Sequence, residues 1–268
     1  MTPQVFAILS GLIEERLGLW YALADKPTLE TKISTRALEL GFDSALDYYY
    51  YLRYDDPDGS ELGLLTETLV VNETFFYREY DQLKVVLSKF VVPMIEAGRR
   101  PRIWCAACST GEEPSTIAMW LAERGRLDRV ELIASDISAA ALAIAKGGRY
   151  RMRSLRQIPP GVEPARWITE DSGTLLVKPE IRAAIQWRRL NLMDDAAVGA
   201  MGELDVVLCR NLLIYFRDET VQRIVRRLTD RLRPGGLLLV GVSESLMRFG
   251  TMLRCEEHDG VFIYRKVT

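Results

Sequence analysis

Apolar positions in the first 70 residues recur at the spacing of an α-helix. They include Leu9, Leu12, Ile13, Leu17, Ile33, Ala37 and Leu40. Gly41 is a typical helix stop, and Ser44 is placed to cap a further helix from Ala45 to about Tyr54. The four tyrosines at 48–51 cannot share one helix face, so we expect some of them at a packed interface. The pattern predicts a helical domain over residues 1–70.

From residue 102 onward, short apolar runs alternate with amphipathic stretches. The runs expected to be strands are RIWCAA (102–107), VELIAS (130–135), IQWRRL (185–190), LDVVLC (204–209), LLLVGV (237–242) and GVFIYRKV (260–267). One intervening helix is expected to start at Pro114, because proline suits the first helical position, and another covers 219–232. The alternation predicts an α/β fold with a doubly wound parallel sheet over residues 71–268. Such sheets bind ligands at the carboxyl ends of their strands.

The alternation is interrupted between about residues 147 and 184. WIT, EDSG and TLLV predict a small β-hairpin with a polar turn, and RYRMRSLR before it holds four arginines. We expect an insertion over the mouth of the site.

Composition and charge narrow the class of protein. Hydrophobic residues make up 48% and charged residues 27%, without an apolar run of about 18 residues that would span a membrane. Four cysteines are too few for a disulfide framework, and the N-terminus lacks a basic signal region, so we expect a cytoplasmic protein. Residues 1–70 hold 12 acidic and 5 basic side chains, and the rest hold 25 and 30. A positive second part suits an acidic substrate, although two solvated faces explain the charges equally well.

The loop after the first strand, ACSTGEEP (107–114), lacks the glycines that a pyrophosphate needs. Its carboxylates would repel a phosphate and attract a cation. S-adenosylmethionine has no phosphate and carries a sulfonium and an ammonium, and Glu113 is suited to accept hydrogen bonds from that ammonium. The alternative is that Glu112 and Glu113 only complement the dipole of the following helix.

Polar residues also follow the other strands. Asp136 is suited to bind ribose hydroxyls, and Asn191 to contact adenine, whereas a helix cap and a turn residue are the alternatives. Arg210 and Asn211 interrupt an apolar run, and Tyr215 follows four residues later, either turned toward the site or packed in the core.

The linker 71–80 carries Asn72, Thr74 and Arg78. Arg78 is suited to hold a substrate carboxylate, or else pairs on the surface with Glu79 or Asp81.

A metal or redox site is not expected. Cys105 and Cys108 form a CxxC, but a zinc site needs about four ligands and His258 is the only histidine.

The motifs NETFFYRE, AACSTGEEPSTIAMWL, ASDIS, RRLNLMD, CRNLLIYF and LRPGGLLLVGVSES, in this order, resemble the CheR-type chemotaxis protein-glutamate O-methyltransferases. The resemblance covers about residues 71–267. It implies a Rossmann-like, class I methyltransferase sheet with a last antiparallel strand, an N-terminal helical domain and a β-hairpin insertion. It also implies S-adenosylmethionine as cofactor, S-adenosylhomocysteine as product, and methyl transfer to glutamate side chains.

The resemblance also implies roles for individual residues. It assigns cofactor contacts to Asn72, Thr74, Arg78, Glu113 (ammonium), Asp136 (ribose), Asn191 and Leu192 (adenine), and Arg210 and Asn211 (methionine moiety). It makes Arg78 and Tyr215 the expected catalytic residues.

Three departures bear on the partner. Val242 stands where many relatives have histidine, the EDSG turn is short, and residues 1–70 are acidic, with only Lys32 and Arg36 as a basic face. The resemblance implies a chemoreceptor cytoplasmic domain or a similar helical signalling protein as substrate. The short turn argues against a pentapeptide tether. Neither nucleic acid nor membrane insertion is expected.

Two other function classes remain open. The chain fits a cofactor-binding signalling module without catalysis, against which Arg78 and Tyr215 argue. A nucleotide-linked oxidoreductase on a similar sheet is disfavoured by the missing glycines.

Overall fold

The computed structural model describes residues 1–267, which divide into two compact units. The helical unit contains Met1–Val71 and Tyr215–Val221. The sheet unit contains Asn72–Ile214 and the chain from Gln222 onward. No helix in residues 1–267 is both long enough and apolar enough to cross a bilayer.

The helical unit is built from α1 (Pro3–Leu17), η1 (Leu23–Asp25), α2 (Lys26–Glu39), α3 (Ala45–Tyr50), η2 (Tyr51–Asp55) and α4 (Ser60–Leu69). Ser44 caps α3 as the sequence predicts, since its hydroxyl accepts from the N–H groups of Leu46 and Asp47. The predicted helix to Tyr54 changes to π-helical hydrogen bonding at Tyr51. Six of the seven apolar positions named above form the core of this unit, with Leu9, Ile13 and Ile33 fully buried, whereas Leu40, just after α2, is 40% exposed.

The tyrosine run in the helical unit splits between core and surface. Tyr48 is fully buried, whereas Tyr50 is 50% exposed. The Tyr48 hydroxyl donates to Glu61 at 2.5 Å, and Arg36 binds the same carboxylate with two nitrogens. Burial, together with the Glu61 carboxylate, raises the pKa of Tyr48. This buried polar group joins α2, α3 and α4.

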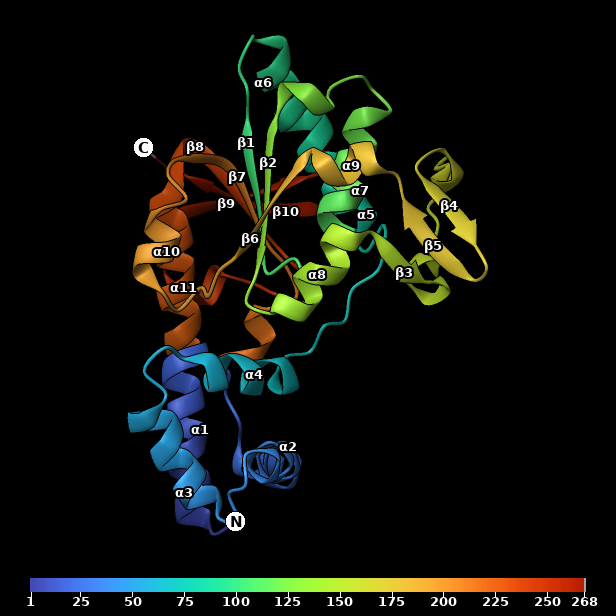
Figure 1. Ribbon diagram of the computed structural model, residues 1–268. Coiled ribbons are helices and arrows are strands. Elements are labelled where there is room, and N and C mark those ends of the chain that lie inside the picture. The colour runs from blue at the N-terminus through green and yellow to red at the C-terminus, as the bar shows by residue number, and fades with distance from the viewer. Residues whose placement is uncertain (268) are drawn as a thin grey trace. The chain divides into compact units, whose positions relative to one another are not determined.

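The main sheet of the sheet unit has seven strands within the described residues, in the order β6-β2-β1-β7-β8-β10-β9. Their bounds are β1 (Arg102–Ala106), β2 (Glu131–Asp136), β6 (Ile185–Arg189), β7 (Leu204–Cys209), β8 (Leu232–Val240), β9 (Leu253–His258) and β10 (Val261–Lys266). The first five strands are parallel, and β10 runs antiparallel to β8 and to β9. Helices lie on both sides of the sheet, with α7, α8 and α9 on one side and α10 on the other (Figure 1). This confirms the doubly wound fold with a last antiparallel strand.

The helices of the sheet unit are α5 (Tyr80–Val86), η3 (Leu87–Val91), α6 (Val92–Glu96), α7 (Glu112–Ala122), η4 (Leu127–Arg129), α8 (Ala139–Gly147), α9 (Pro179–Ala183), α10 (Asp195–Gly199) and η8 (Met247–Phe249). Two further elements are η7 (Leu213–Tyr215) and α11 (Asp218–Arg231). The predicted start of α7 at Pro114 is wrong by two residues. The left-handed backbone of Gly111 precedes Glu112, where the helix begins.

The insertion is a small antiparallel sheet in the order β3-β5-β4, with η5 (Met152–Leu155) and η6 (Pro164–Arg166) nearby in sequence. β4 (Ile168–Asp171) and β5 (Thr174–Val177) form the hairpin that the sequence predicts, and Ser172 and Gly173 make its exposed turn. β3 (Arg149–Arg151) adds a third strand that the sequence analysis does not identify.

Candidate functional site

The loop that follows β1 is held against the end of β2. Cys108 N–H donates to the Ser135 carbonyl at 2.8 Å, and Ser109 N–H donates to Asp136 Oδ2 at 2.7 Å. Asp136 Oδ1 accepts from Ser138 N–H at 2.9 Å. Ala107 and Ser109 both have positive φ, a costly backbone conformation for residues other than glycine that is typical of binding sites, and Gly111 follows with positive φ as well. Asp136 therefore shapes the loop and also lies beside it.

Gly111 is the residue that allows this loop to pack closely. Its φ is +88°, and a Cβ there would come within 2.7 Å of Ala145 Cβ and 2.8 Å of the Trp187 ring. Both the backbone conformation and the space therefore require glycine.

Asn191 and Leu192 follow β6, next to β2. Leu190 N–H donates to the Asp136 carbonyl at 2.9 Å, which brings this turn to the strand end that carries Asp136. Asn191 Oδ1 accepts from Met193 N–H at 2.9 Å, and Leu192 is buried with its carbonyl bound to Arg227. The structure thus gathers the predicted ribose and adenine residues at neighbouring strand ends.

Arg210, directly after β7, is the centre of a buried charge network. Its side chain is 2% exposed and binds Glu113 at 2.5 Å and Glu79 at 3.0 Å. It also donates to the Gln82 side chain and to the Arg78 carbonyl. A buried arginine between two carboxylates fixes the position of both, so Glu113 and the linker are connected through one side chain.

Glu79 is the second carboxylate of this network. Burial is the largest single effect and raises its pKa, but the charge of Arg210 and the hydrogen bonds from Asn211, Val242 and Arg210 together outweigh burial, so the pKa lies below its usual range. The alternative that Glu79 pairs with Arg78 is wrong. The Arg78 guanidinium instead donates to the Glu73 carbonyl at 2.8 Å and lies over the Phe75 ring.

The linker residues Asn72 and Thr74 precede this network in the chain. Asn72 is exposed, and Thr74 and Arg78 are half-buried. The linker is anchored just beyond them, because Phe76 N–H donates to the Ser154 carbonyl and Tyr77 N–H to the Thr116 hydroxyl. The polar side chains of the linker are thus more accessible than its anchored aromatic residues.

Glu112 and Glu113 have different surroundings. The Glu112 carboxyl is 1% exposed and accepts from the hydroxyls of Thr110 and Ser154. Burial raises the pKa of Glu112, despite these hydrogen bonds. Glu112 therefore ties the insertion to the start of α7, whereas Glu113 faces Arg210.

Tyr215 belongs to the helical unit, whereas the predicted cofactor residues belong to the sheet unit. Its carbonyl accepts from Trp20 N–H at 3.0 Å, and Phe216 forms a β-bridge with Leu19. The tyrosine side chain is half-buried and not part of a closed core.

Cys105, Cys108 and Cys209 are fully or almost fully buried at the ends of β1 and β7. Burial raises the pKa of each thiol well above its usual range, so they are not reactive thiolates. Within residues 1–267, no group of three or more His, Cys, Asp or Glu side chains is arranged to hold a metal ion.

The site residues fit S-adenosylmethionine. Carboxylates at the ends of β1 and β2 suit an ammonium and ribose hydroxyls, and the single glycine offers no cradle for a pyrophosphate. Ser109 Oγ is buried and has no hydrogen-bond partner among the described residues. It belongs to the residue whose backbone N–H binds Asp136. A ligand donor or acceptor at this loop would complete its hydrogen bonding.

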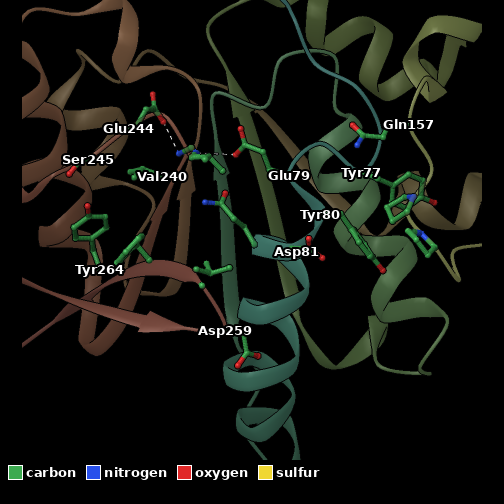
Figure 2. Close-up of a pocket in the computed structure, with 18 of the residues that line it drawn as sticks. Tyr77, Glu79, Tyr80, Asp81, Gln157, Val240, Glu244, Ser245, Asp259 and Tyr264 are labelled. Atoms are coloured by element: carbon green, nitrogen blue, oxygen red, sulfur yellow. Dashed lines mark hydrogen bonds between the residues drawn. The ribbon is translucent and has the colours of Figure 1, made fainter.

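Sequence reasoning missed Glu79 and Glu244 as residues of the site. Glu244 is buried and accepts from three backbone N–H groups at the ends of β7 and β8. Both glutamates line a cavity of about 760 Å³ together with Tyr77, Tyr80, Val240 and Tyr264 (Figure 2). The polar SES segment after an apolar strand was the only available signal for Glu244, and no spacing connects Glu79 with Arg210.

Comparison with known proteins gives consistent results. Residues 72–261 match the family model described as CheR methyltransferase, SAM binding domain. Chemotaxis protein methyltransferase 2 of Vibrio cholerae is 32% identical, over 94% of this chain and 89% of its own length. Chemotaxis protein methyltransferases 1 and 2 of Pseudomonas aeruginosa are 35% and 33% identical, covering 75% and 90% of this chain and 76% and 88% of their own lengths.

Proposed function

Because the chain belongs to the CheR methyltransferase family, we propose that it esterifies glutamate side chains of a chemoreceptor or a related helical signalling protein. S-adenosylmethionine is the cofactor, as the match to a SAM-binding domain over residues 72–261 establishes. When bound, it supplies an electrophilic methyl group on a positively charged sulfur.

The proposed acceptor chemistry agrees with a site that has no histidine. A glutamate carboxyl has a reference pKa of about 4.3, so it is already a nucleophile at neutral pH. The only histidine, His258, lies on the edge strand β9 and contacts Glu256. A glutamate carboxylate therefore needs no histidine to deprotonate it, which supports it as the proposed acceptor.

The observation that supports the proposal is that the carboxylates of Glu113 and Asp136 lie close after β1 and at the end of β2, where they suit a positively charged methyl donor. In the proposed site, Glu113 holds the ammonium, Asp136 the ribose, and Asn191 with Leu192 the adenine side. Arg210 and Asn211 hold the methionine moiety, and Asn72, Thr74 and Arg78 cover it from the linker. Each of these roles is carried over from the family motifs.

Two residues act on the acceptor in this proposal. Arg78, a half-buried residue, pairs with the substrate carboxylate, and Tyr215 orients it for displacement in line with the sulfur. Alignment and desolvation of the two reactants can supply up to about 7–11 kcal/mol of the barrier, so no further catalytic group is needed.

The direct test is a search for base-labile methyl esters. Chemoreceptor cytoplasmic fragments are incubated with the purified protein and methyl-labelled S-adenosylmethionine, and volatile methanol is measured after alkali. We expect methanol from glutamate esters, mapped by mass spectrometry. Base-stable label on the fragment would replace glutamate with another acceptor. Tight binding of S-adenosylhomocysteine with no transfer to receptors or cell proteins would favour a non-catalytic signalling module.

A further inference from the structure

We propose that Glu244 is a positioning residue that sets the Arg210–Asn211 turn for cofactor binding. Nothing in the family motifs used above assigns it a role. The inference rests on the proposed site, in which Arg210 and Asn211 contact the methionine moiety.

The Glu244 carboxylate accepts hydrogen bonds from three backbone N–H groups, and no basic side chain is among these donors. Oε2 accepts from Asn211 N–H at 2.7 Å and from Gly241 N–H at 2.7 Å, and Oε1 accepts from Leu213 N–H at 2.7 Å. Figure 2 shows Glu244 and Glu79 bonded to the backbone that follows β8. Charge-assisted hydrogen bonds of this kind are about twice as strong as neutral ones. Glu244 therefore joins the ends of two neighbouring strands, β7 and β8.

The turn that Glu244 holds has a costly conformation. Asn211 has φ +57°, in the left-handed region, and its N–H is the one bound to Glu244. Its side chain donates to Glu79 at 3.1 Å, and Glu79 also binds Arg210. The two glutamates hold different parts of the turn, because Glu244 binds its backbone and Glu79 binds its side chains.

Gly241 completes the packing of this turn. A Cβ on Gly241 would lie 2.6 Å from Asn211 Nδ2 and 2.9 Å from Glu244 Oε2. Both atoms hold hydrogen bonds, and the Asn211 backbone nitrogen would lie only 3.0 Å from the same Cβ, so an added methyl would disturb the turn. Its position then determines where Arg210 meets Glu113.

The first variant is Glu244→Gln, which preserves size. A glutamine has one acceptor oxygen, so in either orientation its NH2 group faces at least one backbone N–H. We expect binding of S-adenosylhomocysteine, measured by calorimetry, to weaken by about 10- to 100-fold, as for loss of one charged hydrogen bond. Glu257→Gln is the matched control, because that carboxylate is exposed on β9, and it should bind as wild type does.

A double-mutant cycle separates positioning from general stabilisation. If Glu244 acts through the turn, the Glu244→Gln/Asn211→Ala double variant should bind S-adenosylhomocysteine about as well as the weaker-binding of the two single variants. Their affinities should agree within about threefold. Combined with Asp136→Ala, on the other side of β1, the losses should multiply. Wild-type affinity in folded Glu244→Gln, or losses that multiply with Asn211→Ala, would overturn the proposal.

Gly241→Ala provides a second route if Glu244→Gln does not fold. Its added methyl displaces the same turn without changing a charge, and it should weaken binding non-additively with Asn211→Ala. Normal binding by Gly241→Ala would refute control of affinity by the turn. All these readouts use the cofactor product, so they stay valid if the methyl acceptor is not a glutamate.

Discussion

Arg210→Met tests how much the buried charge network contributes to the fold. Methionine preserves most of the side-chain length but removes the cation from between Glu79 and Glu113. The two carboxylates are only 20% and 14% exposed, and the arginine is 2% exposed. The variant therefore leaves two largely buried negative charges without their common partner.

The expected loss follows from that burial. Removing one partner of a buried ion pair costs about 3–5 kcal/mol, mainly because the remaining charge stays poorly solvated. A domain has a free energy of unfolding of only about 5–15 kcal/mol, so the variant should be severely destabilised. Arg126→Met is the control, because its pair with Glu96 is 3.5 Å long and both side chains are well exposed. Such a surface pair contributes about 0–1 kcal/mol.

The pH dependence gives the sharper measurement. In the wild type the pKa of Glu79 is lowered from 4.5, so its contribution is present above that pH and is lost as the pH falls through the lowered pKa. In Arg210→Met, burial without the cation should raise the pKa of Glu79, and ionisation then destabilises the folded state at neutral pH. The difference between wild type and variant should therefore be largest near pH 7 and smaller near pH 5.

Urea unfolding of the two proteins at both pH values provides the test. If Arg210→Met lost no more free energy of unfolding than Arg126→Met, the network would not stabilise the fold. A difference that grew toward pH 5 would contradict the role given to Glu79.

Further variants test the site from other directions. Asp136→Ala should weaken cofactor binding about tenfold or more, as for one lost charged hydrogen bond, and unchanged affinity by calorimetry would refute the ribose assignment. Tyr215→Phe should reduce turnover more than cofactor affinity, and full activity would exclude a catalytic role. Gly111→Ala should lose about 1–3 kcal/mol more in urea unfolding than Gly98→Ala, because Gly98 has a similar φ of +78° but open space around its Cβ position. A thiol reagent should label half-exposed Cys255 in the native protein but, until unfolding, not the three buried thiols, Cys105, Cys108 and Cys209.

The parallel core of the sheet could be predicted from the sequence because its strands are continuous apolar runs. LDVVLC, for example, is entirely buried as β7. In contrast, LRCEEH could not be predicted to form β9, because an edge strand needs few buried positions and so lacks an apolar run. β3 has three residues, two of them exposed arginines, so it carries no strand pattern.

The site could be predicted only as far as single residues at strand ends. Strand order brings Asp136, Asn191 and Arg210 to one edge of the sheet. Their positions directly after predicted strands are enough to predict this. Arg210 and Glu79 are 131 positions apart in the chain, and their pairing depends on how the linker returns to the sheet. Glu244 binds only backbone N–H groups, which every residue offers, so no side-chain pattern identifies its partners.

The two ends of the insertion differ in how they are held. Its base is tied to the cofactor loop, since the buried Tyr150 donates to the Thr110 carbonyl and Ser154 binds Glu112. Its tip, at Ser172 and Gly173, is exposed. Replacing or lengthening the tip should therefore leave the loop after β1 in place, so the hairpin can vary in length and composition without disturbing that loop.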